Sequence, residues 1–492
     1  MTRHPGGLEP DIPADLLDLS PQEFRRLAHW VVDRTAQHLA TLRDRPAITT
    51  GAAHELAAAL DLPGEPDPVE VGLALLADVA LEHQQHGDHP RYFARVPGPS
   101  SHVAILGEWL ATGMQAIASS WGGGSGTAML ELIALDRLRD ALGLAPGSEG
   151  VLLSGGSMAN TTALIVARAE TGLLGVGGHE AGGHRAVARE PVLWLSDQTH
   201  SSIARGAVRT GWPAERVRVL PTDATGALDV SALAEAVDAG PGIVVATAGT
   251  TNTGAVDDLP AIAAICRAHG LWLHVDGAYG GPAALTPGRA GIAGLALADS
   301  FVLDPQKWLF QPYDIGCLWV ARPGALERTF AMHPEYLRDA QGGRVDLHNR
   351  SLELTRRSRA AKLWLTLRSY GLDTLAAAVQ RGIELAEAAQ ALIADDPRLT
   401  VVTPARLGVV TFAIAGSGDG ALPGRVAAAV TADGYAALTS TMLHGRPVLR
   451  LCTINPRTTV AEIAGTLELV AAAAQRLRRD DGAADGSPAA DR

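Results

Sequence analysis

Residues 271–281 read LWLHVDGAYGG, and residues 298–320, one loop later, read ADSFVLDPQKWLFQPYDIGCLWV. Each segment holds a short apolar run that ends at polar residues: one run ends at Asp276, and the other is followed closely by Lys307. Runs this short and apolar are typical of buried strands. Because open α/β sheets bind ligands outside the carboxyl ends of their strands, we expect the Asp276 carboxylate and the Lys307 amine to face one crevice.

Similar apolar runs alternate with helical patterns through the middle of the chain. Further strands are expected at 151–153, 192–195, 217–220, 243–246 and 315–320, with helices near 158–171, 199–210, 231–239 and 258–269. Such alternation predicts an α/β fold with a doubly wound, mostly parallel sheet covered on both faces, over residues 99–368. A helical pattern over 103–142 is interrupted by the glycine run at 121–126.

The flanking segments have different patterns. Residues 1–98 are expected to form an N-terminal helical segment, with helices at 21–42 and 69–86. An α+β small domain is expected over 369–480, with helices at 373–395, 423–433 and 458–479 and strands at 400–403, 408–414 and 446–454. The polar tail, 481–492, is typical of a disordered segment.

Composition excludes several functional classes. The 492 residues carry a net charge of −12, with no dense basic run beyond 356–359, so neither a nucleic-acid partner nor an anionic membrane surface is expected. No apolar run reaches the length of a membrane span. Three widely spaced cysteines indicate reduced thiols and a cytoplasmic protein. His83, His86 and His89 lack zinc-ligand spacing, so no metal site is expected.

The lysine and the carboxylate together suit one cofactor. Apolar neighbours such as Trp308 can lower the pKa of the Lys307 amine, and a neutral amine condenses with aldehydes. Pyridoxal 5'-phosphate (PLP) is such an aldehyde, and it needs a lysine, an acid facing its ring nitrogen and an anion-binding turn. Residues 154–160, SGGSMAN, follow a strand and begin a helix, so Gly156 and Ser157 supply that turn. A buried Asp and a surface Lys are ordinary, however, and their spacing by itself leaves a structural role open.

The amino-acid sequence of these motifs resembles that of the group II PLP-dependent amino-acid decarboxylases, from about His89 to the C-terminal helix. The resemblance implies a type I PLP-dependent transferase fold and a homodimer with its active site at the subunit boundary. It also implies that Lys307 holds PLP as a Schiff base and that Asp276 keeps the ring nitrogen protonated.

Other motifs extend this resemblance. In SDQTHSS, at 196–202, His200 matches the histidine that stacks on the cofactor ring, and in ATAGTT, at 246–251, Thr250 matches a cofactor contact. The resemblance places further residues beside the cofactor, namely Ala278, Asp304 and Gln306. It places others beside the substrate, namely Arg95, Gly98 and Trp121.

Two departures bear on the reaction. The residue before the lysine is Gln306, where the family commonly has His, and residues 346–350, DLHNR, contain no Tyr to return a proton to the substrate carbon. Tyr336 lies too early to match that loop tyrosine, so His348 is the expected acid.

We therefore expect a PLP-dependent carboxy-lyase acting on an L-amino acid or amino-acid conjugate. The alternative is decarboxylation with oxidative deamination, in which O2 takes the electrons and an aldehyde forms. An aminotransferase is a third interpretation, because it uses the same Asp and Lys. A catalytically inactive scaffold is a fourth, which absence of a PLP absorption band would favour.

Overall fold

Seven strands form the main sheet of the larger of two compact units, which are Met1–Gln85 and His86–Arg492. The computed structural model describes residues 16–171, 191–237, 241–331, 345–417 and 420–485. The strand order is β1-β7-β6-β5-β4-β2-β3, and β7 runs antiparallel to both of its neighbours while the other pairs are parallel. The predicted α/β sheet of mostly parallel strands is confirmed. The strands are β1 (Glu149–Leu153), β2 (Val192–Ser196), β3 (Val217–Leu220), β4 (Gly242–Thr247), β5 (Trp272–Asp276), β6 (Ser300–Leu303) and β7 (Gly316–Val320).

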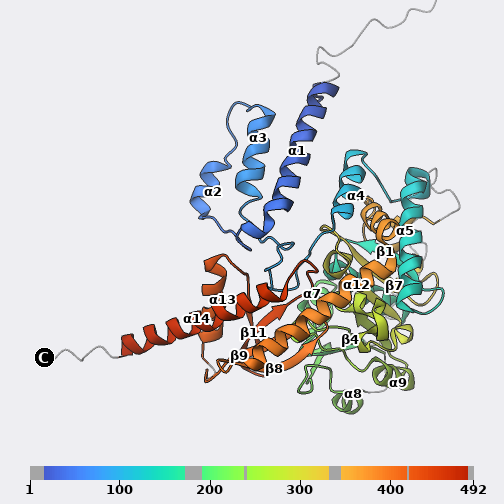
Figure 1. Cartoon of the computed structure of the whole chain (residues 1–492). Helices are drawn as coiled ribbons and strands as arrows, with labels where there is room; N and C mark the ends of the chain where they lie inside the picture. The colour runs from blue at the N-terminus through green and yellow to red at the C-terminus, as the bar shows by residue number, and fades with distance from the viewer. Residues whose placement is uncertain (1–15, 172–190, 238–240, 332–344, 418–419, 486–492) are drawn as a thin grey trace, which may run out of the picture. The chain divides into compact units, whose positions relative to one another are not determined.

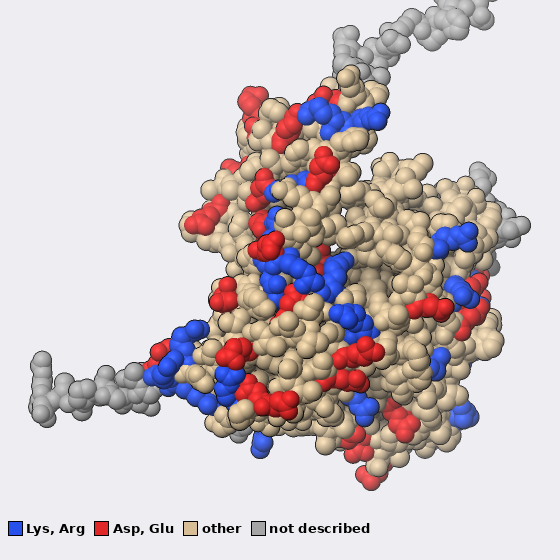
Figure 2. Space-filling model, in the orientation of Figure 1, with Lys and Arg blue, Asp and Glu red and all other residues tan. Residues whose placement is uncertain are grey.

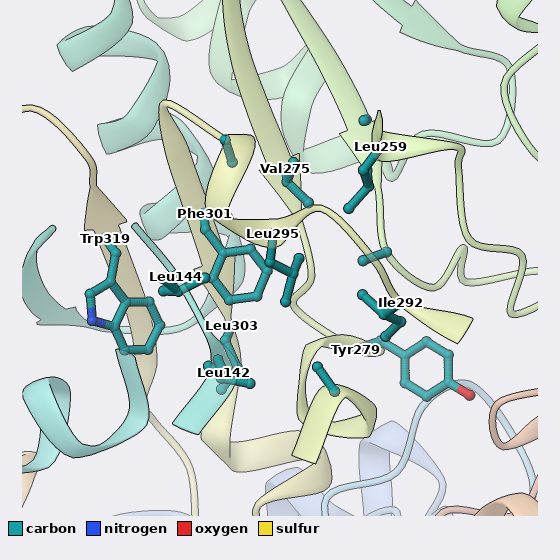
Figure 3. Close-up of a cluster of buried hydrophobic side chains, with 14 of the residues drawn as sticks. Leu142, Leu144, Leu259, Val275, Tyr279, Ile292, Leu295, Phe301, Leu303 and Trp319 are labelled. Atoms are coloured by element: carbon teal, nitrogen blue, oxygen red, sulfur yellow. The ribbon is translucent and has the colours of Figure 1, made fainter. Parts of the chain in front are cut away.

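Helices cover both faces of this sheet (Figure 1). Successive residues of a strand face opposite sides, so Phe301 and Val302 of β6 belong to different apolar clusters. The Phe301 cluster, part of which Figure 3 shows, includes side chains of α5 (Trp121–Leu142) and α9 (Leu259–His269). The Val302 cluster includes side chains of α6 (Gly156–Glu170), α7 (Ser201–Arg209) and α11 (Ala325–Phe330). A further helix, α8 (Val230–Ala236), lies between β3 and β4 in the chain.

The glycine run at 121–126 interrupts the helical geometry at Gly124, as predicted. The run also forms the first turns of α5, where the Ser120 side chain accepts a hydrogen bond from the Gly123 N–H and caps the helix. A longer break that was not predicted comes earlier, between the end of α4 (His102–Gly113) and Trp121. Only Gly124 departs from helical geometry, and a side chain there would collide with the Ile117 carbonyl.

A second, antiparallel sheet has the strand order β10-β11-β9-β8. The sequence pattern predicted three of its strands and missed β10, a short edge strand with a half-exposed face. Phe93 is tied to this sheet, since its N–H donates to the Ala437 carbonyl and its carbonyl accepts from the Cys452 N–H. The strands are β8 (Leu399–Arg406), β9 (Val409–Ile414), β10 (Thr439–Leu443) and β11 (Arg446–Cys452), and the helices beside them are α12 (Ala360–Asp395), α13 (Leu422–Asp433) and α14 (Val460–Asp485).

Helix α12 links the two sheets. It starts at Ala360, earlier than predicted, and changes direction at Gly371, whose φ of 73° favours glycine. Its first part packs against α4 and α5, and its later part packs against β8 and β9 (Figure 1). Helix α14 extends to Asp485, into the predicted tail, and Asp481 pairs with Arg425 of α13. The rest of that tail lies outside the described residues.

The smaller unit contains α1 (Pro21–Thr41), α2 (Ala53–Ala59) and α3 (Val69–Leu75). Ser20 caps α1 by accepting from the Glu23 N–H. Arg26 of α1 pairs with Glu70 of α3, and Arg34 of α1 pairs with Asp78, just after α3. These ion pairs hold α1 beside α3 and the residues that follow it. Several large apolar side chains of this unit are exposed, among them Phe24, Trp30 and Val32.

Charged residues of both signs are interspersed on the face that Figure 2 shows. None of the helices in the described residues is both long enough and apolar enough to cross a bilayer.

Candidate active site

A cavity of about 280 Å³ opens where β1, β2, β4, β5 and β6 end. It is the place that the strand pattern predicts for a ligand in an open α/β sheet. Most of its lining comes from residues directly after a strand or at the first turn of a helix. The lining residues are Ser154, Gly155, Gly156, Ser157, Asn160, His200, Ser202, Thr247, Gly249, Thr251, Asp276, Ala278, Tyr279, Asp304, Gln306 and Lys307.

The turn at 154–157, here called the phosphate turn, joins β1 to α6. Gly155 has a φ of 102°, which a residue with a side chain rarely adopts, and α6 begins at Gly156. A Cβ on Gly156 would lie 2.7 Å from Asp304 Oδ2, so only glycine fits there. The first N–H groups of a helix have no partner within the helix and favour anions. The 15-residue helix α6 thus presents an anion-binding end to the cavity.

Asp276 ends β5 and is held at both carboxylate oxygens. Oδ2 accepts a hydrogen bond of 2.9 Å from Asn160 Nδ2, and Oδ1 accepts one of 3.0 Å from the Ala278 N–H. The side chain is buried yet lines the cavity. One donor on each oxygen therefore fixes the orientation of the carboxylate.

Lys307 lies in the short helix α10 (Pro305–Trp308), with its Nζ 3.1 Å from Asp304 Oδ2. Burial is the largest single effect on the pKa of Lys307 and lowers it, but the Asp304 and Asp276 carboxylates, together with the contact to Asp304 and the nearby Tyr313, outweigh burial, and the net pKa is raised. The expectation that apolar neighbours lower this pKa is therefore wrong for the amine beside Asp304. Burial raises the pKa of Asp304 to about 6, against the opposing effect of Lys307. The buried Asp304 carboxylate therefore has a different partner once an incoming group neutralises or replaces the Lys307 charge.

His200 caps α7 and lines the cavity. Its Nδ1 accepts a hydrogen bond from the Ser202 N–H, and the Ser202 hydroxyl is 2.9 Å away. Because a backbone N–H can only donate, Nδ1 is the unprotonated nitrogen of the neutral ring. Desolvation lowers the pKa of His200, and the Lys307 charge acts in the same direction while Asp276 opposes it.

Gln306 lines the cavity, whereas Thr250 does not. The Gln306 Oε1 accepts from the Ile315 N–H at 2.8 Å, while its amide nitrogen lies beside Gly155 of the phosphate turn. The buried Thr250 hydroxyl is directed to Thr253, at 2.8 Å, and it is not among the lining residues. Its neighbours Gly249 and Thr251 line the cavity instead.

The proposed substrate residues divide into two groups. Gly98 belongs beside the site, since a Cβ there would lie 2.9 Å from the Gln306 carbonyl oxygen and 2.7 Å from the Tyr313 hydroxyl. Arg95 is close to the same tyrosine, because its charge acts to lower the pKa of Tyr313, which burial raises. The Arg95 carbonyl accepts a 2.5 Å hydrogen bond from Arg450.

Trp121 and His348 are brought together elsewhere. The Trp121 N–H donates to Asp346, and the buried His348 hydrogen-bonds through Nδ1 to the Ser119 carbonyl at 3.1 Å. Neither residue lines the cavity of its own chain. Tyr336 lies outside the described residues.

Sequence reasoning missed Asn160 and His274. His274 stands two residues before Asp276 on β5, so both side chains lie on the same face of the strand, and His274 Nε2 is 3.0 Å from Asn160 Oδ1. Asn160 follows Gly156 by four residues, one helical turn, which places it below the phosphate turn. The spacing between Gly156 and Asn160 could be read from the sequence, but the partner of Asn160 could not.

These residues fit PLP. Three groups face one cavity: the phosphate turn, the Asp276 carboxylate and the Lys307 amine. The turn is shaped for an anion, since a Cβ on Gly156 would strike Asp304. These three groups match the three parts of that cofactor, namely a phosphate, a ring nitrogen and an aldehyde.

Comparisons with known proteins agree with this chemistry. The model of the pyridoxal-dependent decarboxylase conserved domain matches residues 55–415. An aromatic-L-amino-acid decarboxylase of Bacillus atrophaeus is 36% identical over 481 residues, 94% of this chain and 97% of that protein. A phenylacetaldehyde synthase of Arabidopsis thaliana is 31% identical over 469 residues, 89% of this chain and 93% of that protein. The crystal structure of Oryza sativa TDC with PLP and tryptamine, at 26% identity, has a TM-score of 0.85 and covers 93% of this chain and 99% of its own.

Proposed function

Since this chain belongs to the pyridoxal-dependent decarboxylase family, we propose that the phosphate turn, Asp276 and Lys307 bind PLP and that the product is the amine of an L-amino acid. The chain is a PLP-dependent carboxy-lyase with a small-molecule amino-acid substrate. The observation that carries the assignment is the convergence of a helix N-terminus, a carboxylate and a lysine on one cavity.

Several of the residues that line the cavity have separate proposed roles in the reaction. When bound, PLP supplies an aldehyde for the amine and a ring that draws electrons from the bond to the departing CO2. The α6 N-terminus holds the phosphate, and the Asp276 carboxylate holds a proton on the ring nitrogen. Lys307 would supply the amine that binds the aldehyde, and His200 would present a neutral ring whose Nδ1 already accepts a hydrogen bond.

Substrate choice depends on the residues beside Gln306. Gly98, Arg95 and Tyr313 are proposed to meet the substrate side chain, because Gly98 lies beside both Tyr313 and Gln306, the residue before Lys307. Arg95 supports a polar substrate, since it is a charged residue close to Tyr313. A polar or acidic amino acid is therefore a better candidate than an unsubstituted aromatic one.

A homodimer is proposed as the active form. Large apolar side chains of α4 and α5 are exposed, and the surface over α4 is mostly uncharged in Figure 2. The side chains are Leu106, Leu110, Met114, Met129 and Ile133. Trp121 and His348 remain candidates for the reaction only if a second copy brings them to this cavity. The three buried free cysteines support the cytoplasm as the compartment.

A second product deserves a direct test, because the relatives include phenylacetaldehyde synthases. In that reaction the amino acid, O2 and water give an aldehyde, CO2, ammonia and hydrogen peroxide. Turnover of a panel of amino acids in aerated D2O distinguishes the outcomes. The proposal expects CO2 and an amine carrying one deuterium on the α-carbon. Aldehyde with equimolar peroxide would overturn it in favour of oxidative deamination, and a keto acid without CO2 would indicate transamination.

The group that returns the proton is tested in the same assay. His348→Gln and Tyr336→Phe are compared, because His348 is buried against Ser119 in its own chain and Tyr336 is a tyrosine that precedes residues 346–350 in the sequence. The variant that converts amine to aldehyde identifies the donor. If neither changes the product, the proton comes from another group.

A further inference from the structure

A continuous chain of hydrogen bonds runs from the interior of the sheet to the cavity. Trp272 Nε1 lies 2.9 Å from Ser300 Oγ, which is 2.9 Å from His274 Nδ1. His274 Nε2 is 3.0 Å from Asn160 Oδ1, and Asn160 Nδ2 reaches Asp276 Oδ2 at 2.9 Å. All five side chains are buried, so water does not compete for these bonds.

The first donor, Trp272, and the last acceptor, Asp276, fix the direction of every hydrogen bond between them. An indole N–H can only donate, so Ser300 Oγ accepts from Trp272 and its own proton is free to point to His274 Nδ1. At the other end an ionised Asp276 can only accept, so the Asn160 amide nitrogen must face it and the Asn160 oxygen must face His274. His274 must then donate from Nε2.

The ring of His274 meets both demands when it is neutral. With Nδ1 accepting and Nε2 donating, it carries one proton. Burial lowers the pKa of His274 to about 4, with Asp276 and Ser300 opposing this effect. His274 is therefore neutral near pH 7, and each link has one donor and one acceptor.

Asn160 also connects the two groups that face the cofactor. Its Nδ2 lies 3.0 Å from the Ser202 hydroxyl, which in turn is 2.9 Å from His200 Nδ1. One hydrogen of this amide nitrogen thus binds the Asp276 carboxylate, and the other binds Ser202, the hydrogen-bond partner of His200. An aliphatic side chain of the same size would leave Asp276 with the Ala278 N–H as its remaining donor among these contacts.

We propose that Asn160 is a positioning residue that keeps Asp276 ionised and oriented, so that the proton shared with the cofactor stays on the ring nitrogen. This inference rests on the proposed role of Asp276. Without Asn160, the carboxylate loses a donor that stabilises its charge, and the proton moves toward Asp276. The ring then draws electrons less strongly.

The test reads the proton directly. Wild type, Asn160→Leu and Thr162→Val are reconstituted with PLP labelled with 15N in the ring, and the 15N chemical shift and kcat/KM are measured. In Asn160→Leu we expect the shift to move toward that of an unprotonated ring, and kcat/KM to fall roughly tenfold to hundredfold, as for loss of a hydrogen bond to a charged group. Thr162→Val is the matched control, because Thr162 is buried on the same helix and its hydroxyl has no partner among the described residues.

Three outcomes are decisive. A wild-type 15N shift in Asn160→Leu with bound cofactor would overturn the inference, even if the variant melts at a lower temperature. If Asn160→Leu fails to fold, the smaller Asn160→Ser is measured in the same way, and a wild-type shift there also overturns it. An unprotonated ring in the wild type, unchanged by Asp276→Asn, would instead refute the role of Asp276 and with it this inference.

Discussion

Replacing Gly316 with alanine tests whether the phosphate turn is held in place by β7. Gly316 begins β7, opposite Leu153 of β1, and a Cβ there would lie 2.6 Å from the Gly155 carbonyl carbon and 2.7 Å from its Cα. Carbon atoms normally meet at about 3.5–4.0 Å, so the turn must shift by roughly 0.8 Å. These are backbone atoms of a turn with positive φ, and they cannot rotate away as a side chain would.

The expected cost follows from this overlap. Overpacking of a well-packed site costs about 1–3 kcal/mol, which corresponds to a roughly 5- to 150-fold weaker Kd if it falls on the PLP-binding conformation. Titration of the apoenzyme with PLP, followed by cofactor absorbance, measures Kd, and thermal unfolding of the apoenzyme measures stability. We expect weaker PLP binding and a lower Tm.

Gly126→Ala is the matched control for that experiment. Gly126 lies in α5, and a Cβ there meets no atom within 4 Å, so alanine should leave Kd unchanged and slightly stabilise the helix. Wild-type Kd in Gly316→Ala would refute the reasoning, because it would mean that the turn binds phosphate without the geometry that β7 imposes.

Three more predictions follow from the site and its supports. Lys307→Ala should abolish CO2 release and the absorbance of covalently held cofactor; continued turnover would disprove the lysine assignment. The pKa of His274 is lowered to about 4 against about 6.5 when unfolded, so its stabilising effect is complete above pH 6.5 and is lost as pH falls toward 4. The unfolding free energy of wild type, measured in urea, should therefore fall by up to about 3 kcal/mol more than that of His274→Gln as the pH is lowered from 6.5 to 4. The variant His269→Gln, at an exposed histidine, should keep the wild-type pH dependence. Arg356→Met should lower the unfolding free energy by about 3–5 kcal/mol, because it leaves the buried Glu131 carboxylate without its 2.7 Å partner; a change below 1 kcal/mol would contradict this.

Much of the fold was readable from the sequence because the central strands of the main sheet are short, apolar and buried on both faces. The runs that end at Asp276 and precede Lys307 placed both groups at one sheet edge, as the cavity confirms. The antiparallel direction of β7 was not readable, since its apolar run looks the same in either direction. Nor was the edge strand β10, whose pattern is weak on its exposed face.

The site was less predictable where it depends on distant partners. The Lys307 pKa is set by carboxylates that folding brings near it, not by its apolar neighbours in the chain. Thr250 matched a motif, yet its hydroxyl bonds to Thr253 within the turn. Asn160 meets His274 and Asp276 from more than 110 positions away, and no spacing rule in one sequence reveals such a pairing.

The position of β1 in the sheet has a consequence for biosynthesis. β1 is an edge strand whose neighbour in the sheet is β7, and the phosphate turn follows it directly. On the ribosome, residues 149–157 emerge long before residues 316–320, which complete the pairing. The proposed anion site is therefore translated well before the strand that completes its pairing, so a nascent chain should not hold PLP firmly until β7 has emerged.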